Sequence, residues 1–226
     1  CFVEDYETAI STAIRDFSPD VVGVSLRNLD NVSYPYSVSY LPFYKRVVSA
    51  IRRRTQVPVV LGGSGFALVP GPVMEYLGAD FGISGEGERS LVQLVRELEG
   101  KETSLDGVGL TRPRSGIVIK DLDALGLPDR TGLDNEAYLQ RGGMGNVQTK
   151  RGCPRRCIYC TYPLLEGRPI RMRNPERVCD EIENLVRQGV DHLFFVDNVF
   201  NDPPEHAKMI SMEIFRRKIK VKWSCY

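Results

Sequence analysis

The sequence contains no apolar run approaching the length of about 18 residues that a membrane-spanning helix needs, and no charged start followed by an apolar stretch. It also lacks an excess of either charge, because 30 lysines and arginines stand against 29 acidic residues. A chain with a net charge of +1 has no overall field that would attract nucleic acid or a membrane surface. These absences predict a cytoplasmic protein without a transmembrane segment.

Internal repeats and low-complexity tracts are missing too, and the only histidines are His192 and His206. The six cysteines come without a secretion signal, so we expect reduced thiols rather than three disulfides. A chain of 226 residues, 42% hydrophobic and 26% charged, has the composition of one large or two ordinary globular domains. It begins inside a helical pattern and ends in a strand-like one, so we expect a piece of a longer protein.

Short apolar runs alternate with helical patterns in the first half, which predicts βαβ units and a parallel sheet. The predicted strands are residues 20–26, 57–65 and 79–88, and the predicted helices are residues 4–17, 43–54 and 89–98. On the middle helix we expect Phe43, Val47, Ala50 and Ile51 to face inward. Each strand ends in a glycine-rich or polar loop, and in a doubly wound sheet such loops form the carboxyl edge where ligands bind.

The second half predicts a further alternation of strands and helices after a connector. Residues 107–122 resemble two short strands around a turn, and residues 112–144 are interpreted as the connector. Asn174 is a good N-cap and Pro175 suits a first helical position, so a helix is expected from there to Gly189. The other expected elements are strands at 146–152, 191–201 and 221–226 and a helix at 205–217.

Three cysteines lie within eight residues in the segment "KRGCPRRCIYCTYP", at Cys153, Cys157 and Cys160. Structural zinc takes four protein ligands, so a zinc site here would need completion, for example by His192 or His206, which are more than 30 residues away. Three thiolates on one loop can instead hold three irons of a cubane iron–sulfur cluster and leave the fourth iron open to a substrate. Cys1, Cys179 and Cys225 are isolated, and packing is the expected role of each, with a functional role as the alternative for Cys225, which ends a strand near the expected crevice.

The spacing CxxxCxxC after a predicted strand resembles the radical SAM superfamily. The resemblance implies that Cys153, Cys157 and Cys160 ligate a [4Fe-4S] cluster whose free iron chelates S-adenosyl-L-methionine (SAM). It also implies that the aromatic Tyr159, before the last cysteine, lies against the adenine. "FVDNVFN" resembles the family's second SAM-contacting strand end, with Asp197 and Asn198 as candidates, although the Gly-Gly-Glu run of many members is missing.

The first half resembles the cobalamin-binding branch of that superfamily. The residues that carry this resemblance are Ser25 in "GVSLRNLDN", Gly62 and Gly63 in "LGGSG", and Gly85, Glu86, Gly87 and Glu88 in "SGEGE". Glycines let the backbone approach a bulky ligand closely, so we expect cobalamin contacts at Ser25, Gly62, Gly63, Gly85, Glu86 and Gly87. An Asp-x-His-x-x-Gly motif, whose histidine ligates cobalt in B12 domains, is missing here. Either cobalt has no histidine ligand, or the relevant loop precedes this piece.

Together the two resemblances imply an α/β protein in which a Rossmann-like doubly wound parallel sheet of the B12-binding type is followed by a partial (β/α) radical SAM barrel. The expected boundaries are a cobalamin-binding domain at 1–111, the connector at 112–144 and the first half of the barrel at 145–226. The superfamily typically has six βα units, and about three strands are expected here. The piece by itself is therefore expected to be inactive.

Basic residues concentrate around the cysteines. Residues 150–177 contain eight lysines and arginines against Glu166 and Glu176. Such a shell would stabilise an anionic cluster and the SAM carboxylate, and would suit docking of an acidic reducing partner such as a ferredoxin or flavodoxin. Nucleic-acid binding would need further exposed aromatic residues on the same face, since Tyr159 and Tyr162 belong to the cysteine loop.

The leading interpretation is a cobalamin-dependent radical SAM C-methyltransferase acting on a small molecule. The resemblance implies that a 5'-deoxyadenosyl radical abstracts hydrogen from an unactivated carbon, and that methylcobalamin then supplies the methyl group. A porphyrin-cyclase-like ring formation or rearrangement is an alternative that the motifs do not separate. A methylthiotransferase is another, but only Cys1 precedes Cys153, whereas that family has three cysteines there. The non-enzyme alternative is a B12- or nucleotide-binding module with a zinc staple.

Overall fold

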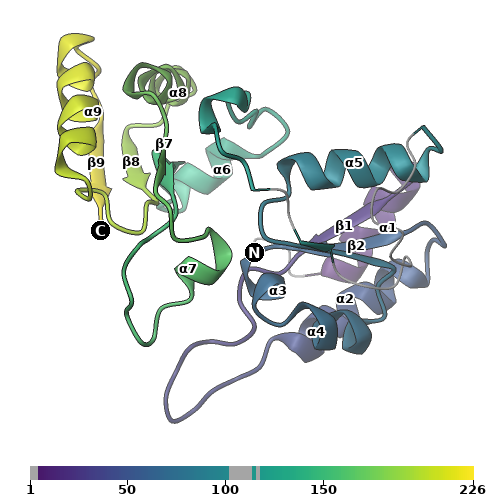
Figure 1. The fold of residues 1–226 in the computed structure, drawn as a ribbon. Coiled ribbons are helices and arrows are strands. Elements are labelled where there is room, and N and C mark those ends of the chain that lie inside the picture. The colour runs from purple at the N-terminus through teal and green to yellow at the C-terminus, as the bar shows by residue number, and fades with distance from the viewer. Residues whose placement is uncertain (1–4, 102–113, 116–117) are drawn as a thin grey trace. The chain divides into compact units, whose positions relative to one another are not determined.

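A computed structural model describes residues 5–101, 114–115 and 118–226. The chain divides into two compact units, Cys1–Val118 and Ile119–Tyr226, and Figure 1 shows the elements of each. Each unit is an α/β arrangement built on a parallel sheet. The two strands expected around the turn at 107–122 fall largely outside the described residues. Within the described part of that segment, the structure contains the short strand β4, Arg114–Ser115. No helix in the described part of the chain is long and apolar enough to cross a membrane.

The first unit contains a sheet of order β1-β2-β3-β4, in which all neighbouring strands are parallel. Its strands β1 to β3 are Val22–Ser25, Val59–Gly62 and Phe81–Ser84. Its helices α1 to α5 are Tyr6–Phe17, Leu41–Arg52, Ser64–Leu68, Pro70–Leu77 and Glu88–Leu98. All three predicted strands and all three predicted helices are present, while α3 and α4 were not predicted.

Both faces of the first sheet are covered, which explains the nearly continuous apolar runs of its strands. Val59 and Leu61 pack with the helices α1 to α4, whereas Val60 between them packs with Leu94 of α5. Figure 1 shows α5 on one side of β2 and α2 with α4 on the other. Ala50 and Ile51 of α2 are buried as predicted.

The prediction that Phe43 faces the core was wrong, because its ring is 41% exposed. Phe43 lies on α2 against Tyr6 of α1, with ring centroids 5.3 Å apart in an edge-to-face arrangement. Val48 takes the buried position on α2 instead. The helix begins at Leu41, and the pairing of α1 with α2 draws Phe43 to the rim between them.

The second unit contains a parallel sheet of order β5-β8-β9 and a separate antiparallel pair of β6 and β7. The strands β5 to β9 are Gly145–Val147, Lys150–Arg151, Arg171–Met172, His192–Phe195 and Lys222–Cys225. The helices are η1 at Leu122–Ala124, α6 at Asn135–Gln140, α7 at Tyr162–Leu165, α8 at Pro175–Arg187 and α9 at Pro204–Arg216. The predicted connector thus contains the short helices η1 and α6.

One face of the second sheet packs against α8 and α9 and forms its core. Val147, Leu193 and Phe195 from the strands meet Ile182 of α8 and Ile210 of α9 there. The predicted start of α8 is confirmed in detail, since the Asn174 side chain accepts a hydrogen bond from the amide of Glu176 and Pro175 is the first helical residue. The other face of the sheet carries the alternate residues, and the loops at its carboxyl edge include the cysteines.

Candidate functional site

The predicted cobalamin residues gather at the carboxyl edge of the first sheet. Ser25 and Gly62 end β1 and β2 and lie directly opposite each other in register. Gly63 follows with a φ of +93°, and a Cβ atom there would lie 2.6 Å from the Leu26 carbonyl oxygen and 2.8 Å from the Ser25 hydroxyl. Only glycine fits that position, because both the left-handed backbone and the close approach exclude a side chain.

The remaining predicted residues of this group follow β3, which neighbours β2. Gly85 has a φ of +98° directly after the strand, and Gly87 precedes the first turn of α5. A Cβ at Gly62 would meet only the Ile83 carbonyl oxygen, at 3.8 Å, which is an ordinary contact. The structure therefore brings Ser25, Gly62, Gly63 and Gly85 to one edge, and Gly62 is a glycine that the fold itself does not require.

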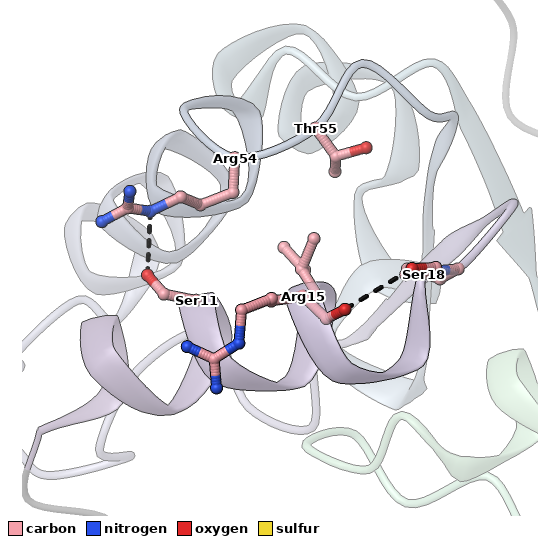
Figure 2. Close-up of a pocket in the computed structure, with 7 residues that line it drawn as sticks. Ser11, Arg15, Ser18, Arg54 and Thr55 are labelled. Carbon is pink, nitrogen blue, oxygen red and sulfur yellow. Dashed lines mark hydrogen bonds between the residues drawn. The ribbon is translucent and has the colours of Figure 1, made fainter.

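A hollow of about 740 Å³ lies at the opposite edge of this unit (Figure 2). It lies between the end of α1, with Ser11, Arg15 and Ser18, and the segment after α2, with Arg54 and Thr55. Arg54 Nε donates to the Ser11 hydroxyl at 2.9 Å across one side of it. Helix C-termini and the amino ends of strands surround this hollow, so it is separate from the carboxyl edge that holds the predicted cobalamin residues.

The cysteine loop of the second unit is fastened at its base. Lys150 and Arg151 of β6 pair with Met172 and Arg171 of β7, and the amide of Cys153 donates to the Gly167 carbonyl oxygen at 3.0 Å. Between them, Gly152 has a φ of +92°, and a Cβ there would lie 2.1 Å from the Pro169 carbonyl oxygen. The two ends of the loop, near residues 152 and 169, therefore lie next to each other.

The three cysteines of this loop are free thiols in different environments. Cys153 is buried at the base, Cys160 is half-buried and Cys157 is exposed, and the neighbouring Tyr159 is 87% exposed. Nowhere in the described ranges do three His, Cys, Asp or Glu side chains converge closely enough to hold a single metal ion. The donor set is therefore three sulfurs spread along one loop, which chemically fits a cluster larger than one ion.

Both histidines are engaged away from this loop. His192 begins β8 and its Nε2 lies 3.0 Å from the Ser224 hydroxyl, at the opposite end of the strand from Asp197. His206 is buried on α9, with Nε2 2.8 Å from the Arg173 carbonyl oxygen. Neither is placed to complete a zinc site with the cysteines.

Asp197 and Asn198 follow β8, beside the start of the cysteine loop. The buried Asp197 carboxylate accepts hydrogen bonds from the Thr149 amide and hydroxyl and from the Lys150 amide. Lys150 is itself buried, with Nζ donating to the Phe200 carbonyl oxygen at 2.6 Å and lying 3.9 Å from Asp197. Burial lowers the pKa of Lys150, and the nearby Asp197 carboxylate opposes that shift.

A carboxylate that was not singled out from the sequence links these pieces. Glu166 Oε2 accepts hydrogen bonds from the Gly152 amide at 3.0 Å and from Asn198 Nδ2 at 2.9 Å, while its Oε1 accepts one from Gln148 at 3.2 Å. Asn198 Oδ1 is buried without a partner among the described residues. Glu166 is one of only two acidic residues in the basic stretch from 150 to 177. Its position among so many cations was the one feature of the sequence that could have indicated its role.

Two family models match this chain, one for each unit. Residues 1–95 match the B12 binding domain, and residues 147–225 match the radical SAM superfamily. These are the two classes of domain to which the glycine-lined edge and the cysteine loop belong.

Individual relatives match most of this chain, across both units. The tryptophan 2-C-methyltransferase of Streptomyces laurentii is 30% identical over 96% of this chain and 45% of its own length. The hopanoid C-2 methylase of Rhodopseudomonas palustris is 28% identical over 72% of this chain and 30% of its own length. The structure of the radical SAM methyltransferase TsrM from Kitasatospora setae, with cobalamin and a [4Fe-4S] cluster bound, superposes with a TM-score of 0.81 at 31% identity.

The TsrM match covers 95% of this chain and 44% of that one. The chain therefore belongs to the radical SAM proteins that have a B12-binding domain. It spans less than half of the length of each of these relatives.

Proposed function

We propose that the protein to which this chain belongs transfers a methyl group to an unactivated carbon of a small molecule by cobalamin-dependent radical SAM chemistry. The observation that carries this proposal is the loop of three free thiols at the carboxyl end of a parallel β/α sheet, in a chain that also has a B12-binding domain. Relatives named as methyltransferases at 30 and 31% identity support methylation as the reaction.

Cys153, Cys157 and Cys160 would hold the [4Fe-4S] cluster, and the edge formed by Ser25, Gly62, Gly63, Gly85, Glu86 and Gly87 would hold cobalamin. When bound, these groups supply the one-electron chemistry and the methyl carrier, and the protein supplies position and exclusion of water. The exposed ring of Tyr159 is free to cover the adenine of SAM. Asn198, with its unpartnered Oδ1, would contact the polar part of SAM.

For Asp197, predicted from the sequence as a SAM contact, we propose a positioning role instead. Its two oxygens already accept three hydrogen bonds from Thr149 and Lys150, and the residue is 1% exposed. A carboxylate so fully occupied supports the segment that leads into the cysteine loop, and Asn198 beside it remains available.

The reducing partner is proposed to be an acidic ferredoxin or flavodoxin in the cytoplasm. Arg156 and Arg168 are exposed on the cysteine loop and present positive charge beside the thiols. Opposite charges steer a protein electron donor to such a surface and make its association rate fall with ionic strength. A stopped-flow measurement of cluster reduction at increasing salt tests this partner class.

The function is tested on the full-length protein after anaerobic reconstitution. We expect four irons and four sulfides per chain, tight binding of cob(II)alamin, and transfer of label from methyl-labelled SAM to candidate metabolites. Replacing Cys157 with Ala should abolish transfer while cobalamin remains bound, and replacing Cys225 with Ala is the matched control. One zinc without labile sulfide would contradict the radical SAM assignment, and no binding of cob(II)alamin would contradict the cobalamin assignment.

A further inference from the structure

A cavity of about 270 Å³ lies within the second unit, at the carboxyl ends of β5 and β8. Asn146, Gln148 and Val196 line it, and the first two are alternate residues around Val147, which is buried in the core against the helices. Because side chains alternate across a strand, Asn146 and Gln148 point away from that core, and Glu181 of α8 also lines the cavity, so the cavity lies beside the edge of β5 that is free among the described strands. The carboxyl ends of parallel strands are where α/β proteins bind their ligands.

Three arginines and one glutamate also line this cavity. Each oxygen of the buried Glu181 accepts a hydrogen bond from a different arginine, Oε1 from Arg130 at 2.8 Å and Oε2 from Arg173 at 2.7 Å. Arg151 adds a third guanidinium, which donates from Nε to the Gln148 side chain at 2.9 Å. Two guanidinium groups surround the single carboxylate of Glu181, so this wall of the cavity is formally positive.

The two arginines bound to Glu181 each have nitrogen atoms that donate no hydrogen bond within the described residues. Arg130 uses Nη2 for Glu181 and for the Asn146 carbonyl oxygen, and Arg173 uses Nη1 for Glu181 and for the Gln148 carbonyl oxygen. The other two nitrogens of each guanidinium make no hydrogen bond within the described part of the chain. Guanidinium groups bind carboxylates through two parallel N–H bonds, and these arginines are already fixed in orientation.

The rest of the lining is apolar. Leu122, Leu125 and Pro128 from the segment before α6 face the cavity, together with Val196. A volume of about 270 Å³ lies near the small end of the range for ligand sites, so the cavity suits a small molecule rather than a nucleotide. The combination of a positive wall and an apolar wall fits an organic anion with a compact hydrophobic body.

We propose that this cavity binds the carboxylate of a small organic acid, and that this acid is the substrate. The assignment as substrate rests on the function proposed above, while the binding itself does not. Arg151 also connects the cavity to the cysteine loop, because it is two residues before Cys153 and contacts Gln148. A bound acid would therefore lie beside the loop proposed to hold the cluster.

The test measures binding by isothermal titration calorimetry on the full-length protein before any cluster or cobalamin is added. The probes are phenylacetate, its neutral isostere phenylacetamide and inorganic phosphate. We expect phenylacetate to bind at least tenfold more tightly than phenylacetamide, and phosphate to bind at least tenfold more weakly than phenylacetate because it makes no contact with the apolar wall. Equal binding of the acid and the amide would overturn the proposal, and so would tighter binding of phosphate.

Two variants locate the site. Leu125→Trp fills the cavity and keeps all four charged side chains, and Arg151→Gln removes one cation; each is expected to weaken phenylacetate binding at least tenfold. Arg187→Gln, an exposed arginine of α8, is the matched control and should bind like the parent protein. Far-ultraviolet circular dichroism and urea midpoints establish that the variants are folded. Unchanged binding by Leu125→Trp would place the acid elsewhere and overturn the proposal.

The source of the carboxylate is separated by competition. SAM itself carries a carboxylate, so displacement of phenylacetate by SAM in the absence of a cluster would overturn the assignment to the substrate. Failure of methyl transfer with intact phenylacetate binding would count against the proposed function and leave the acid site standing. Methyl transfer without any binding of organic acids would support the proposed function and overturn the acid site.

Discussion

The carboxylate of Asp197 accepts two hydrogen bonds from Thr149, with Oδ1 2.7 Å from the amide nitrogen and Oδ2 2.5 Å from the hydroxyl oxygen. These bonds tie the end of β8 to the segment between β5 and the cysteine loop. The buried ammonium group of Lys150 lies 3.9 Å from the same carboxylate. Asp197 therefore holds the segment that leads into the cysteine loop, in addition to the contacts that Glu166 and β7 make with the start of the loop.

Replacing Asp197 with Ala is expected to lower the free energy of unfolding of the second unit by roughly 3–5 kcal/mol, because Lys150 and Thr149 would lose a buried partner. The control is Asp202→Asn, which removes a carboxylate paired with the exposed Arg155 and should cost about 0–1 kcal/mol. Urea unfolding followed by the fluorescence of Trp223, the single tryptophan, reports on this unit. Equal losses in both variants would contradict a special role for Asp197.

Replacing Gly152 with Ala is expected to lower the iron bound after reconstitution. Its positive φ costs about 1–2 kcal/mol for a residue with a Cβ, and the new atom would also collide with the Pro169 carbonyl oxygen. Gly167→Ala shares the backbone cost, since its φ is +82°, but its Cβ would have ordinary contact with Pro169 at 3.9 Å. Iron per chain should therefore fall clearly only in Gly152→Ala, and a matching fall in both would contradict the collision argument.

Replacing Gly62 with Ala tests the cobalamin edge without disturbing the fold. Its Cβ has room in this structure, so the stability of the first unit should change by less than about 1 kcal/mol. If cobalamin lies against this backbone, the methyl group should weaken cob(II)alamin binding by about tenfold or more. The matched control is Gly23→Ala on β1, where a Cβ has no neighbour within 4 Å. Unaltered affinity in Gly62→Ala would show that the ligand does not approach Gly62.

Thiol labelling should distinguish the cysteines sharply. Burial raises the pKa of the Cys179 thiol to about 11. At pH 8 its thiolate is then about one part in a thousand, and the reactive form increases only as the pH rises toward that value. Iodoacetamide at pH 8 followed by peptide mass spectrometry should modify the exposed Cys157 and leave Cys179 intact. Comparable modification of Cys179 would mean that α8 opens readily.

Much of the fold was predictable because local patterns determine it. The apolar strands that start at Val22, Val59 and Phe81 alternate with amphipathic helices, and the cap at Asn174 is a contact between neighbours in sequence. Phe43 failed because its periodicity matched a buried face, while its ring is held at the rim by Tyr6 of another helix.

The parts of the site that escaped prediction depend on contacts between distant residues. Glu166 meets Asn198 across 32 positions, and Glu181 meets Arg130 across 51. Lys150 was counted in a cationic shell, but folding buries it against Phe200. Sequence spacing identifies the three cysteines, because their chemistry is local to one loop, and it gives no indication of the side chains that fix that loop.

The arginine–glutamate–arginine group has a consequence for how this sheet can grow. Residues on alternate positions of β5 point their carbonyl groups away from β8, and Arg130 and Arg173 already occupy those of Asn146 and Gln148. That side of β5 is closed by side chains, whereas β9 is paired only with β8 among the described strands. A strand added to this sheet would therefore meet carbonyl groups already occupied by arginines at β5 and a strand edge without a second partner strand among the described residues at β9, so addition next to β9 is favoured.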